Sequence, residues 1–558
     1  MSGTVDIIEA LPEELRSREH QMFPTLTPEM AERIAEYGPV EDVPAGDFVF
    51  RRGQRDANFF LVLEGALEIF GINEYGREAG IVVHRTRQFT GEVDLFNEHE
   101  YLVSARTIEA TRLARLDRAA FRRMMAAEAD IGEIIMRAFI LRRVGLMRSA
   151  SSGAVVVGPA HGGDTLRIQR FLTRNAYPFR LVDTDSNPNA MGVQLCFQIP
   201  TPSLPAVILP GGAVLANPSI PDLADRLGLT AEIDPEHIYD LVVVGAGPGG
   251  LAAAVYGASE GLDVLVIEHM APGGQAGTSS RIENYLGFPT GISGGALAAR
   301  AQVQAQKFGA RLAVSRQALQ LYCDDLPYRI SLDDGRVASA NAVVVATGAR
   351  YRQIDVPDYG RFEGQGIHYA ATAMEGALCQ DEEVIVVGGG NSAGQAAVFL
   401  SRIARHVHIL VRGAGLSSTM SSYLINRIDA SRRITLHTGC EITGVEGDRV
   451  LRHVTWTCRD DGAVTRIPCG NLFVMIGAAP NTDWLDGCLE RDAHGFIVTG
   501  SRENGAYPPS PYETSRRGVY AVGDVRAGSV KRVASAVGEG SVVVQAIHAY
   551  LDSLRLTI

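Results

Sequence analysis

The residues best suited to chemistry in this sequence lie in segment 239–269. An apolar run rich in β-branched residues (241–244) leads into a glycine-rich turn, an alanine-rich stretch and a second apolar run that ends at Glu268. This order predicts a buried strand, a tight turn, a helix and a second strand. The turn has the spacing G-x-G-x-x-G and reads Gly245, Ala246, Gly247, Pro248, Gly249, Gly250.

Such a turn can hold the diphosphate of a dinucleotide. Gly245 permits the sharp turn, Gly247 lets the backbone approach a pyrophosphate, and Gly250 lets the helix pack on the sheet. The helix N-terminus offers free N–H groups and a positive dipole end to the phosphates. Glu268, about 20 residues further on, is placed to accept hydrogen bonds from ribose hydroxyls. A glycine turn that binds nothing is the alternative, and the strand, helix and acid together argue against it.

The same pattern of strand, turn, helix and strand recurs in segment 382–413, so the chain contains an internal repeat. Its turn has the form G-x-G-x-x-A, and its residues are Gly388, Gly390, Asn391, Ser392 and Ala393. Two dinucleotide sites in one chain suit a hydride donor and a hydride acceptor. The second strand is followed by Arg412 instead of an acid. An arginine there can pair with a 2′-phosphate, which favours NADPH over NADH; a solvated surface arginine is the alternative.

Length and composition limit the remaining possibilities. At 558 residues the chain is too long for one core, and three or four domains are expected. Its formal net charge of −12 argues against nucleic acid or an anionic membrane as the main partner. No apolar run reaches about 18 residues, and the first residues are acidic and polar. We therefore expect a cytoplasmic protein.

The cysteines show no metal or redox pattern. There are seven, none of them in C-x-x-C or beside a histidine cluster with zinc spacing. Scattered cysteines of this kind are expected to be buried, unpaired hydrophobic residues. They are Cys196, Cys323, Cys379, Cys440, Cys458, Cys469 and Cys488.

The N-terminal part, residues 1–150, reads as short strands followed by helices. Residues 59–70 are expected to form a hairpin that turns at Glu64-Gly65, and the stretch after Asp117 has apolar residues at helical spacing. The stretch FVFRRGQRDANFFLVLEGALEI is similar to the cyclic-nucleotide-binding domain of cAMP-responsive proteins. This resemblance implies a β jelly-roll followed by helices.

A cyclic nucleotide is a possible ligand of this domain by that resemblance. The Gly-Glu pair of that family is present as Gly91-Glu92, and Glu92 could accept a hydrogen bond from a ribose hydroxyl. However, Val103 stands where the family has the phosphate-binding arginine. Arg106 lies a few residues further along the chain than the position of that arginine. A charge-assisted bond from an arginine contributes about 1.5–3 kcal/mol, so a structural or partner-sensing role is expected instead.

Residues 151–235 form a small α/β pattern of strand, helix, strand and strand, with a terminal helix. The run Ser203–Val207 followed by Gly211-Gly212 resembles the proline-containing strand of thioredoxin and glutaredoxin folds, in which the X-Pro bond is cis. Those folds carry C-x-x-C at the first helix. Here residues 159–164 read PAHGGD, so a domain of this kind would have lost its thiol chemistry.

The C-terminal half resembles the low-molecular-weight thioredoxin reductases. The stretches that carry the resemblance are PGGQ (272–275), SSRIENYLGFPTGISG (279–294), NAVVVATGAR (341–350) and GVYAVGDVRAGSVKRVASAVGEGSVVV (518–543). The resemblance implies FAD, with Asp524 at the ribityl chain and the N-terminus of a helix that begins near Val533 pointing at the isoalloxazine ring. The residues it places near the flavin are Gly274, Gln275, Asn284, Thr347, Gly348, Gly523, Asp524, Val533 and Ala534.

The redox pair of that family is missing. Where thioredoxin reductases carry C-A-T-C, this sequence has Ala370 and Ala373, and alanine can neither attack a disulfide nor store electrons. Cys379 is nearby but alone. His368 could act as an acid, although an ordinary structural histidine is the stronger interpretation. No catalytic residue and no metal ligand is assigned from the sequence.

These patterns predict a multidomain flavin oxidoreductase. NAD(P)H would pass hydride to FAD, and the electrons would leave directly to a small-molecule or protein acceptor; a redox or nucleotide sensor with little turnover is the alternative. The resemblance also implies a homodimer. The expected domains are cyclic-nucleotide-binding-like (1–150), thioredoxin-like (151–235), FAD-binding (236–350 and 471–558) and NAD(P)H-binding (351–470), the last two being Rossmann-like α/β domains of the thioredoxin reductase type.

Overall fold

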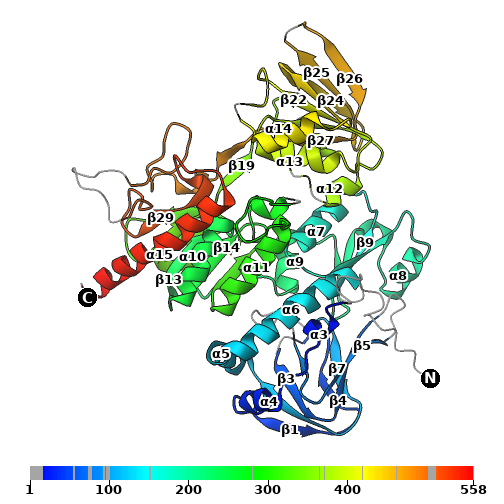
Figure 1. The fold of residues 1–558 in the computed structure, drawn as a ribbon, viewed down its shortest axis with the longest axis vertical. Coiled ribbons are helices and arrows are strands. Elements are labelled where there is room, and N and C mark those ends of the chain that lie inside the picture. Colours follow the sequence, from blue (N-terminus) through cyan, green and yellow to red (C-terminus); the bar gives the residue numbers. More distant parts are fainter. Residues whose placement is uncertain are drawn as a thin grey trace. The chain divides into compact units, whose positions relative to one another are not determined.

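The computed structural model describes residues 17–54, 57–72, 78–91, 95, 101–149, 153–279, 281–363, 365–369, 371, 373–417, 419–459, 461–500 and 510–556. The chain divides into two compact units (Figure 1). Unit 1 comprises residues 1–234, 268–271 and 303–316, and unit 2 comprises residues 235–267, 272–302 and 317–558.

Unit 1 begins with two four-stranded antiparallel sheets. The first has the order β1 (Val40–Val43), β8 (Thr111–Leu116), β3 (Phe59–Glu64), β6 (Phe89–Thr90). The second has the order β2 (Phe48–Phe50), β7 (Ser104–Thr107), β4 (Ala66–Ile72), β5 (Glu78–Arg85). Helices α3 (Glu19–Met22), α4 (Pro28–Ala35), α5 (Arg118–Ala127) and α6 (Ala129–Ser149) accompany them.

The expected hairpin over residues 59–70 is wrong. β3 and β4 follow one another in the chain but pair in different sheets. Between them, Gly65 has a φ of 88°, and a Cβ at this position would lie 2.6 Å from the carbonyl oxygen of Ala110. This left-handed residue redirects the chain from one sheet into the other instead of reversing it within one sheet.

The middle residues of unit 1 form a separate four-stranded sheet. Its order is β10 (Phe179–Asp183), β9 (Ala154–Gly158), β11 (Ala206–Ile208), β12 (Val214–Ala216), with β10 parallel to β9 and the other pairs antiparallel. Its helices are α7 (Gly163–Arg174), α8 (Ala190–Cys196) and α9 (Ile220–Arg226). The Leu204–Pro205 peptide bond, which leads into β11, is cis.

The first glycine motif is part of a seven-stranded sheet with the order β15-β14-β13-β18-β17-β16, in which β29 also pairs with β18. Strands β14 and β18 run parallel to β13, and β29 runs parallel to β18, as buried crossover connections require, whereas β16, β17 and β18 pair antiparallel. The strands are β13 (Ile238–Val244), β14 (Val264–Glu268), β15 (Arg311–Val314), β16 (Ala318–Tyr322), β17 (Tyr328–Leu332), β18 (Val337–Val345) and β29 (Val519–Ala521). The accompanying helices are α10 (Pro248–Ser259), α11 (Gly294–Lys307) and α15 (Val533–Arg555).

The second glycine motif belongs to a parallel five-stranded sheet with the order β20 (Ile367–His368), β27 (Asn471–Val474), β21 (Glu383–Val387), β22 (His406–Val411), β23 (Ile434–Thr438). β27 therefore pairs with this nucleotide fold although it begins just past the boundary expected at residue 470. The remaining elements are α12 (Ala373–Ala377), α13 (Asn391–Leu400), α14 (Ser422–Asp429), the sheet β24 (Cys440–Gly447), β25 (Leu451–Cys458), β26 (Val464–Pro468), and the pair β19 (Ala349–Tyr351), β28 (Ala478–Pro480).

The expectation that all cysteines are buried and unpaired is wrong for five of them. Cys323 and Cys488 form one disulfide, and Cys440 and Cys458, which face each other across β24 and β25, form another. Cys196 is exposed, whereas Cys379 and Cys469 are free and buried. The partners of the first pair are 165 residues apart, so no local spacing could reveal them.

Across the described ranges, we find no helix with the length and apolar character needed to cross a bilayer.

Candidate functional site

The first glycine turn connects β13 directly to α10. Gly245 has a φ of 104°, and a Cβ there would lie 2.4 Å from the carbonyl oxygen of Ala346. A Cβ at Gly250 would lie only 1.9 Å from the carbonyl oxygen of Gly245. Only glycine can therefore occupy these two positions without moving the backbone, as expected for the turn and for the packing of the helix on the sheet.

Gly247 differs from its neighbours because the space in front of it is open. A Cβ at this position would meet no atom within 4 Å. Gly247 is the N-cap of α10, no side chain caps the helix, and Pro248 occupies the first turn. The free N–H groups of this turn fit a pyrophosphate, which is the group that the G-x-G-x-x-G spacing predicts.

Glu268 ends β14, the strand that is parallel to β13 on the side away from β18. Its Oε1 accepts hydrogen bonds from the backbone N–H groups of Met270 (2.9 Å) and Ala271 (3.3 Å). The carboxylate is thus oriented by the turn that follows the strand, at the strand end where a dinucleotide fold carries the acid that binds ribose hydroxyls.

The GGQ loop packs against the glycine turn. The N–H of Gly273 donates to the carbonyl of Ala246 (2.7 Å), and a Cβ at Gly274 would lie 3.1 Å from the Cα of Gly247. The amide of Gln275 donates to the carbonyl of Ala349, just after the Thr347-Gly348 turn. These contacts join two of the predicted flavin-binding segments to the pyrophosphate turn.

Asn481 fixes the Thr347-Gly348 turn from a distant part of the sequence. The Thr347 hydroxyl donates to the carbonyl of Asn481 (2.8 Å), and the Asn481 side chain donates to the carbonyl of Thr347 (3.0 Å). The backbone N–H of Asn481 also donates to the carbonyl of Gly348 (3.1 Å). No local signal in the sequence marks Asn481, because it lies 134 residues from its partner.

The Gly523-Asp524 turn is held by a buried ion pair. Glu539 accepts hydrogen bonds from the N–H of Gly523 (2.6 Å) and from the guanidinium of Arg526 (2.8 Å). Asp524 is partly buried, and burial raises the pKa of its carboxyl group, an effect that the charge of Lys531 opposes. Glu539 and Arg526 were not predicted. Their spacing of 13 residues gives no local signal, although a glutamate within an apolar helix is a hint.

Helix α15 begins next to the first glycine turn. A Cβ at Gly540 would lie 2.1 Å from the carbonyl oxygen of Gly249, and a Cβ at Gly249 would lie 3.2 Å from that of Ala536. The two helices therefore touch at their glycines and run side by side (Figure 1). Val533 and Ala534 form the first turn of α15, which has no side-chain cap. Two helix N-termini are thus available to one anionic ligand.

The second glycine turn repeats the geometry of the first. Gly388 has a φ of 139°, and its Cβ would lie 2.2 Å from the carbonyl oxygen of Met475, whereas a Cβ at Gly390 would meet nothing within 4 Å. Gly390 is the N-cap of α13, which has no side-chain cap, and Ala393 is fully buried. Asn391 and Ser392 are exposed in the first turn. This turn also fits a pyrophosphate.

Three other predicted positions are less constrained. Arg412 is exposed one residue beyond β22, where it is accessible to a 2′-phosphate. Asn284 is exposed on the ENYLGFP loop. His368 is buried, its Nε2 lies 2.9 Å from Oδ1 of Asn471, and its ring packs on Phe473. These contacts support a structural His368.

The position of the redox pair is only partly described. Ala370 lies outside the described residues, and Ala373 begins α12. Burial raises the pKa of Cys379 to about 12, and the pKa of Cys469 is also raised to about 12 by burial. A thiol with such a pKa is a poor nucleophile at neutral pH.

Within the described part of the N-terminal sheets, neither Val103 nor Arg106 offers an unpaired cation to a cyclic phosphate. Val103 is half-buried and packs against an apolar cluster that includes Phe50 and Ile69. Arg106 forms ion pairs with Glu68 and Glu78, both at 2.9 Å. Glu92 lies outside the described residues.

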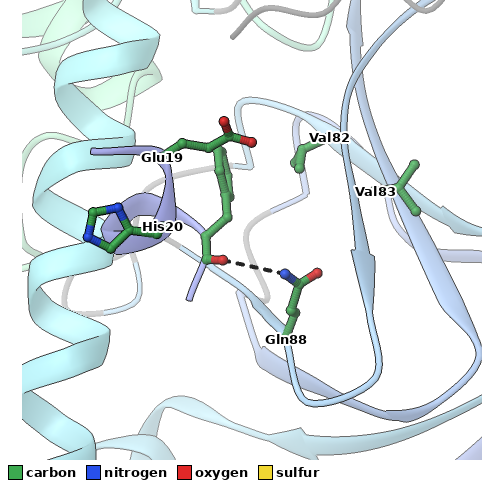
Figure 2. A pocket seen from close by; sticks show the side chains of 6 residues that line it. Glu19, His20, Val82, Val83 and Gln88 are labelled. Carbon is green, nitrogen blue, oxygen red and sulfur yellow. Dashed lines mark hydrogen bonds between the residues drawn. The ribbon is translucent and has the colours of Figure 1, made fainter. Parts of the chain in front are cut away.

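A cavity of about 450 Å³ lies between α3 and β5 (Figure 2). It is lined by Glu19, His20, Phe23, Val82, Val83 and Gln88. The Gln88 amide donates to the carbonyl of Phe23 (3.4 Å). None of the residues predicted to bind a nucleotide lines this cavity, so it is not the candidate site.

Comparisons with known proteins agree with this geometry. Residues 239–540 match the family model for pyridine nucleotide-disulphide oxidoreductases, and residues 40–128 match the cyclic nucleotide-binding domain. Thioredoxin reductase of Bacillus subtilis (strain 168) is 31% identical over 324 residues, which cover 58% of this chain and 98% of the relative. Thioredoxin reductase of Treponema pallidum (strain Nichols) is 32% identical over 320 residues, which cover 57% of this chain and 99% of the relative.

A solved structure shows the same fold. The T. acidophilum thioredoxin reductase superposes with a TM-score of 0.52 at 29% identity, covering 57% of this chain and 100% of that one. Thioredoxin reductases use FAD and NADPH, and both glycine turns described above fit the nucleotides that such use requires. The chain belongs to the pyridine nucleotide-disulphide oxidoreductase family, as a thioredoxin reductase-like, NAD(P)H-dependent flavin oxidoreductase that also carries a cyclic nucleotide-binding domain.

Proposed function

We propose that this enzyme passes electrons from NADPH through FAD to an acceptor that meets the flavin directly. The observation that carries the proposal is the pair of alanines, Ala370 and Ala373, at the positions where thioredoxin reductases carry C-A-T-C. A disulfide relay at these positions is chemically impossible. The buried, high-pKa thiols of Cys379 and Cys469 do not replace it.

The residues of the chain bind and orient two nucleotides. When bound, FAD supplies the two-electron chemistry. The open N–H groups at Gly247 and Gly390 would hold the two pyrophosphates, and Glu268 would hold the flavin ribose. Asp524, in the turn fixed by Glu539, would bind the ribityl chain. The first turn of α15 would favour negative charge on the flavin ring.

NADPH is the proposed donor because Arg412 follows the second strand of the nicotinamide fold. Its side chain is exposed and can reach a 2′-phosphate. The next arginine along the chain is Arg427, which forms an ion pair with Glu283 (2.9 Å). One arginine alone would give a modest preference for NADPH over NADH.

We further propose that residues 151–235 are a thioredoxin-like domain. The strand order β10-β9-β11-β12, with one parallel and two antiparallel pairs, supports this proposal. The two antiparallel sheets of residues 40–116 support a jelly-roll in the N-terminal domain (1–150). We also propose a flavin domain (236–350 and 471–558), a nicotinamide domain (351–470), a cytoplasmic location and a homodimer.

The N-terminal domain is proposed to have a structural or partner-sensing role. Val103 offers no charge to a cyclic phosphate, and Arg106 is occupied by two glutamates. Titration calorimetry with cAMP and cGMP tests this. Heats that fit a micromolar site would contradict it, and their absence up to about millimolar concentration would support it.

Steady-state turnover tests the proposed function as a whole. The purified protein with FAD should oxidise NADPH rapidly when a quinone, oxygen or a one-electron dye accepts the electrons. Thioredoxin should not be reduced. Tight FAD binding with negligible turnover on every acceptor would overturn the proposal and favour a sensor instead.

A further inference from the structure

Two short segments of the flavin half belong to the compact unit of the N-terminal residues, although β15 and the end of β14 also lie in the seven-stranded sheet. Residues 268–271 and 303–316 belong to the same compact unit as residues 1–234. The first of these segments begins with Glu268, the acid expected to bind the flavin ribose. Contacts from outside the nucleotide fold therefore reach the segment that orients this acid.

The first contact comes from the C-terminal end of α7. The Asn175 amide donates to the carbonyl of Met270 (3.4 Å) and to that of Phe171 (2.9 Å), and Asn175 is only 5% exposed. The guanidinium of Arg174 lies 2.7 Å from the sulfur of Met270. Met270 is also the residue whose backbone N–H holds the Glu268 carboxylate. Asn175 thus helps to fix the turn on which the orientation of Glu268 depends.

The second contact comes from α9. Asp225 forms an ion pair with Arg316, whose side chain is only 1% exposed. The backbone N–H of Arg316 donates to the carbonyl of Glu268 (3.0 Å), and its guanidinium also donates to the carbonyl of Ser315 (2.9 Å). A guanidinium buried to this degree is costly without its carboxylate. Asp225 therefore stabilises the residue that contacts the backbone of Glu268.

The residues that follow α9 strengthen the same attachment. The Thr230 hydroxyl donates to the carbonyl of Val314 (2.5 Å), and the N–H of Ala231 donates to the carbonyl of Leu312 (2.8 Å). Both acceptors belong to β15, the strand that leads to Arg316. The attachment thus consists of hydrogen bonds to the backbone of β15, a buried amide, and an ion pair in which the arginine is buried and the Asp225 side chain is half exposed.

We propose that the middle domain, residues 151–235, positions Glu268 for the FAD ribose, with Asn175 and Asp225 as the positioning residues. This inference rests on the proposed role of Glu268 in FAD binding. It gives a function to a domain in which residues 159–164, at the start of α7, read PAHGGD and carry no thiol. Loss of either positioning residue should weaken FAD binding by about tenfold, since a misplaced carboxylate loses a charge-assisted hydrogen bond to the ribose.

The experiment measures the dissociation constant of FAD from flavin fluorescence on the full-length apoprotein. The variants are Asn175→Ala, Asp225→Asn, Asp225→Glu and Glu268→Ala. Thr173→Ala is the matched control, because Thr173 lies in the last turn of α7, close to Asn175, and its side chain is exposed. Asn175→Ala and Asp225→Asn should raise the dissociation constant about tenfold. Asp225→Glu should restore it towards the wild-type value, and Thr173→Ala should leave it unchanged.

A double-mutant cycle separates positioning from general destabilisation. In the Glu268→Ala background, Asn175→Ala should cause no further loss of FAD affinity, because the acid it positions is gone. Equal losses in both backgrounds would overturn the inference, as would wild-type FAD affinity in both single variants. NADPH affinity should not change in any of them. If Asp225→Asn does not fold, Asn175→Ala decides the matter.

The same data distinguish failure of the proposed role of Glu268 from failure of the positioning role of Asn175 and Asp225. If Glu268→Ala binds FAD as tightly as the wild type, the proposed role of Glu268 has failed. If Glu268→Ala weakens FAD binding while Asn175→Ala and Asp225→Asn do not, the role of Glu268 stands and the positioning inference is wrong.

Discussion

Replacement of Gly247 by alanine should separate folding from cofactor binding. Gly247 has a φ of −69° and a ψ of −179°, which alanine adopts readily, and its Cβ would meet no protein atom within 4 Å. The free energy of unfolding of the apoprotein should therefore change by less than about 1 kcal/mol, the usual difference between glycine and alanine at an N-cap. The new methyl group would instead occupy the space through which a pyrophosphate approaches.

The loss of FAD affinity can be worked out from the bonds that the methyl group prevents. A hydrogen bond from a backbone N–H to a charged phosphate contributes about 1.5–3 kcal/mol. Loss of one such bond corresponds to a rise in the FAD dissociation constant of about ten- to a hundredfold. Gly250→Ala should behave differently, since its Cβ would lie 1.9 Å from the carbonyl oxygen of Gly245. That variant should be unstable even without FAD.

The assay combines thermal unfolding of the apoproteins with FAD binding followed by fluorescence quenching. Gly538→Ala is the matched control, because a Cβ at Gly538 in α15 would also meet no atom within 4 Å. It should stabilise the helix by up to about 1 kcal/mol and leave FAD affinity unchanged. A Gly247→Ala protein that binds FAD as tightly as the wild type would refute the assignment of this turn to the pyrophosphate.

Three further changes test other parts of the site. Arg412→Gln should raise the KM for NADPH about tenfold and leave the KM for NADH unchanged, as measured by steady-state kinetics with both donors; an equal effect on both would contradict the 2′-phosphate assignment. Glu539→Gln should cost about 1–3 kcal/mol of stability and weaken FAD binding, because Arg526 and the N–H of Gly523 lose their carboxylate; calorimetry showing no change would exclude this role. Burial, and then the charges of His406 and His437, lower the pKa of His408, whereas Glu383 acts in the opposite direction. The native state therefore resists protonation, and stability should be complete above about pH 6.5 and fall as the pH drops below that value. His408→Gln should reduce this dependence in melts between pH 7.5 and 5.5, and an unchanged slope would show that other groups are responsible.

The two nucleotide folds could be predicted because their signals are local. The strand, turn and helix around Gly245 and around Gly388 are continuous in the sequence, and a close approach of the backbone requires glycine at both of these positions. The contacts that hold the site together are not local. Asn481, Glu539 and Arg316 contact residues far from them in the chain or in another element, and no periodicity or spacing indicates such partners.

The two wrong predictions, a hairpin at Gly65 and unpaired cysteines, have the same origin. The hairpin expected at Gly65 fails because alternation of apolar residues predicts strands but not the sheet to which each strand belongs. The disulfides join cysteines that have no characteristic spacing. In both cases the pairing is decided by tertiary packing.

The stoichiometry of anaerobic reduction by NADPH tests the central claim most directly. A flavin enzyme without a disulfide relay takes up electrons only at its flavin, so about one equivalent of NADPH per FAD should bleach the flavin absorbance completely. The same titration followed by alkylation and mass spectrometry should show no increase in modified cysteines. Consumption of about two equivalents before the end point, with a matching gain of thiols, would reveal a disulfide in redox contact with the flavin and would contradict the account.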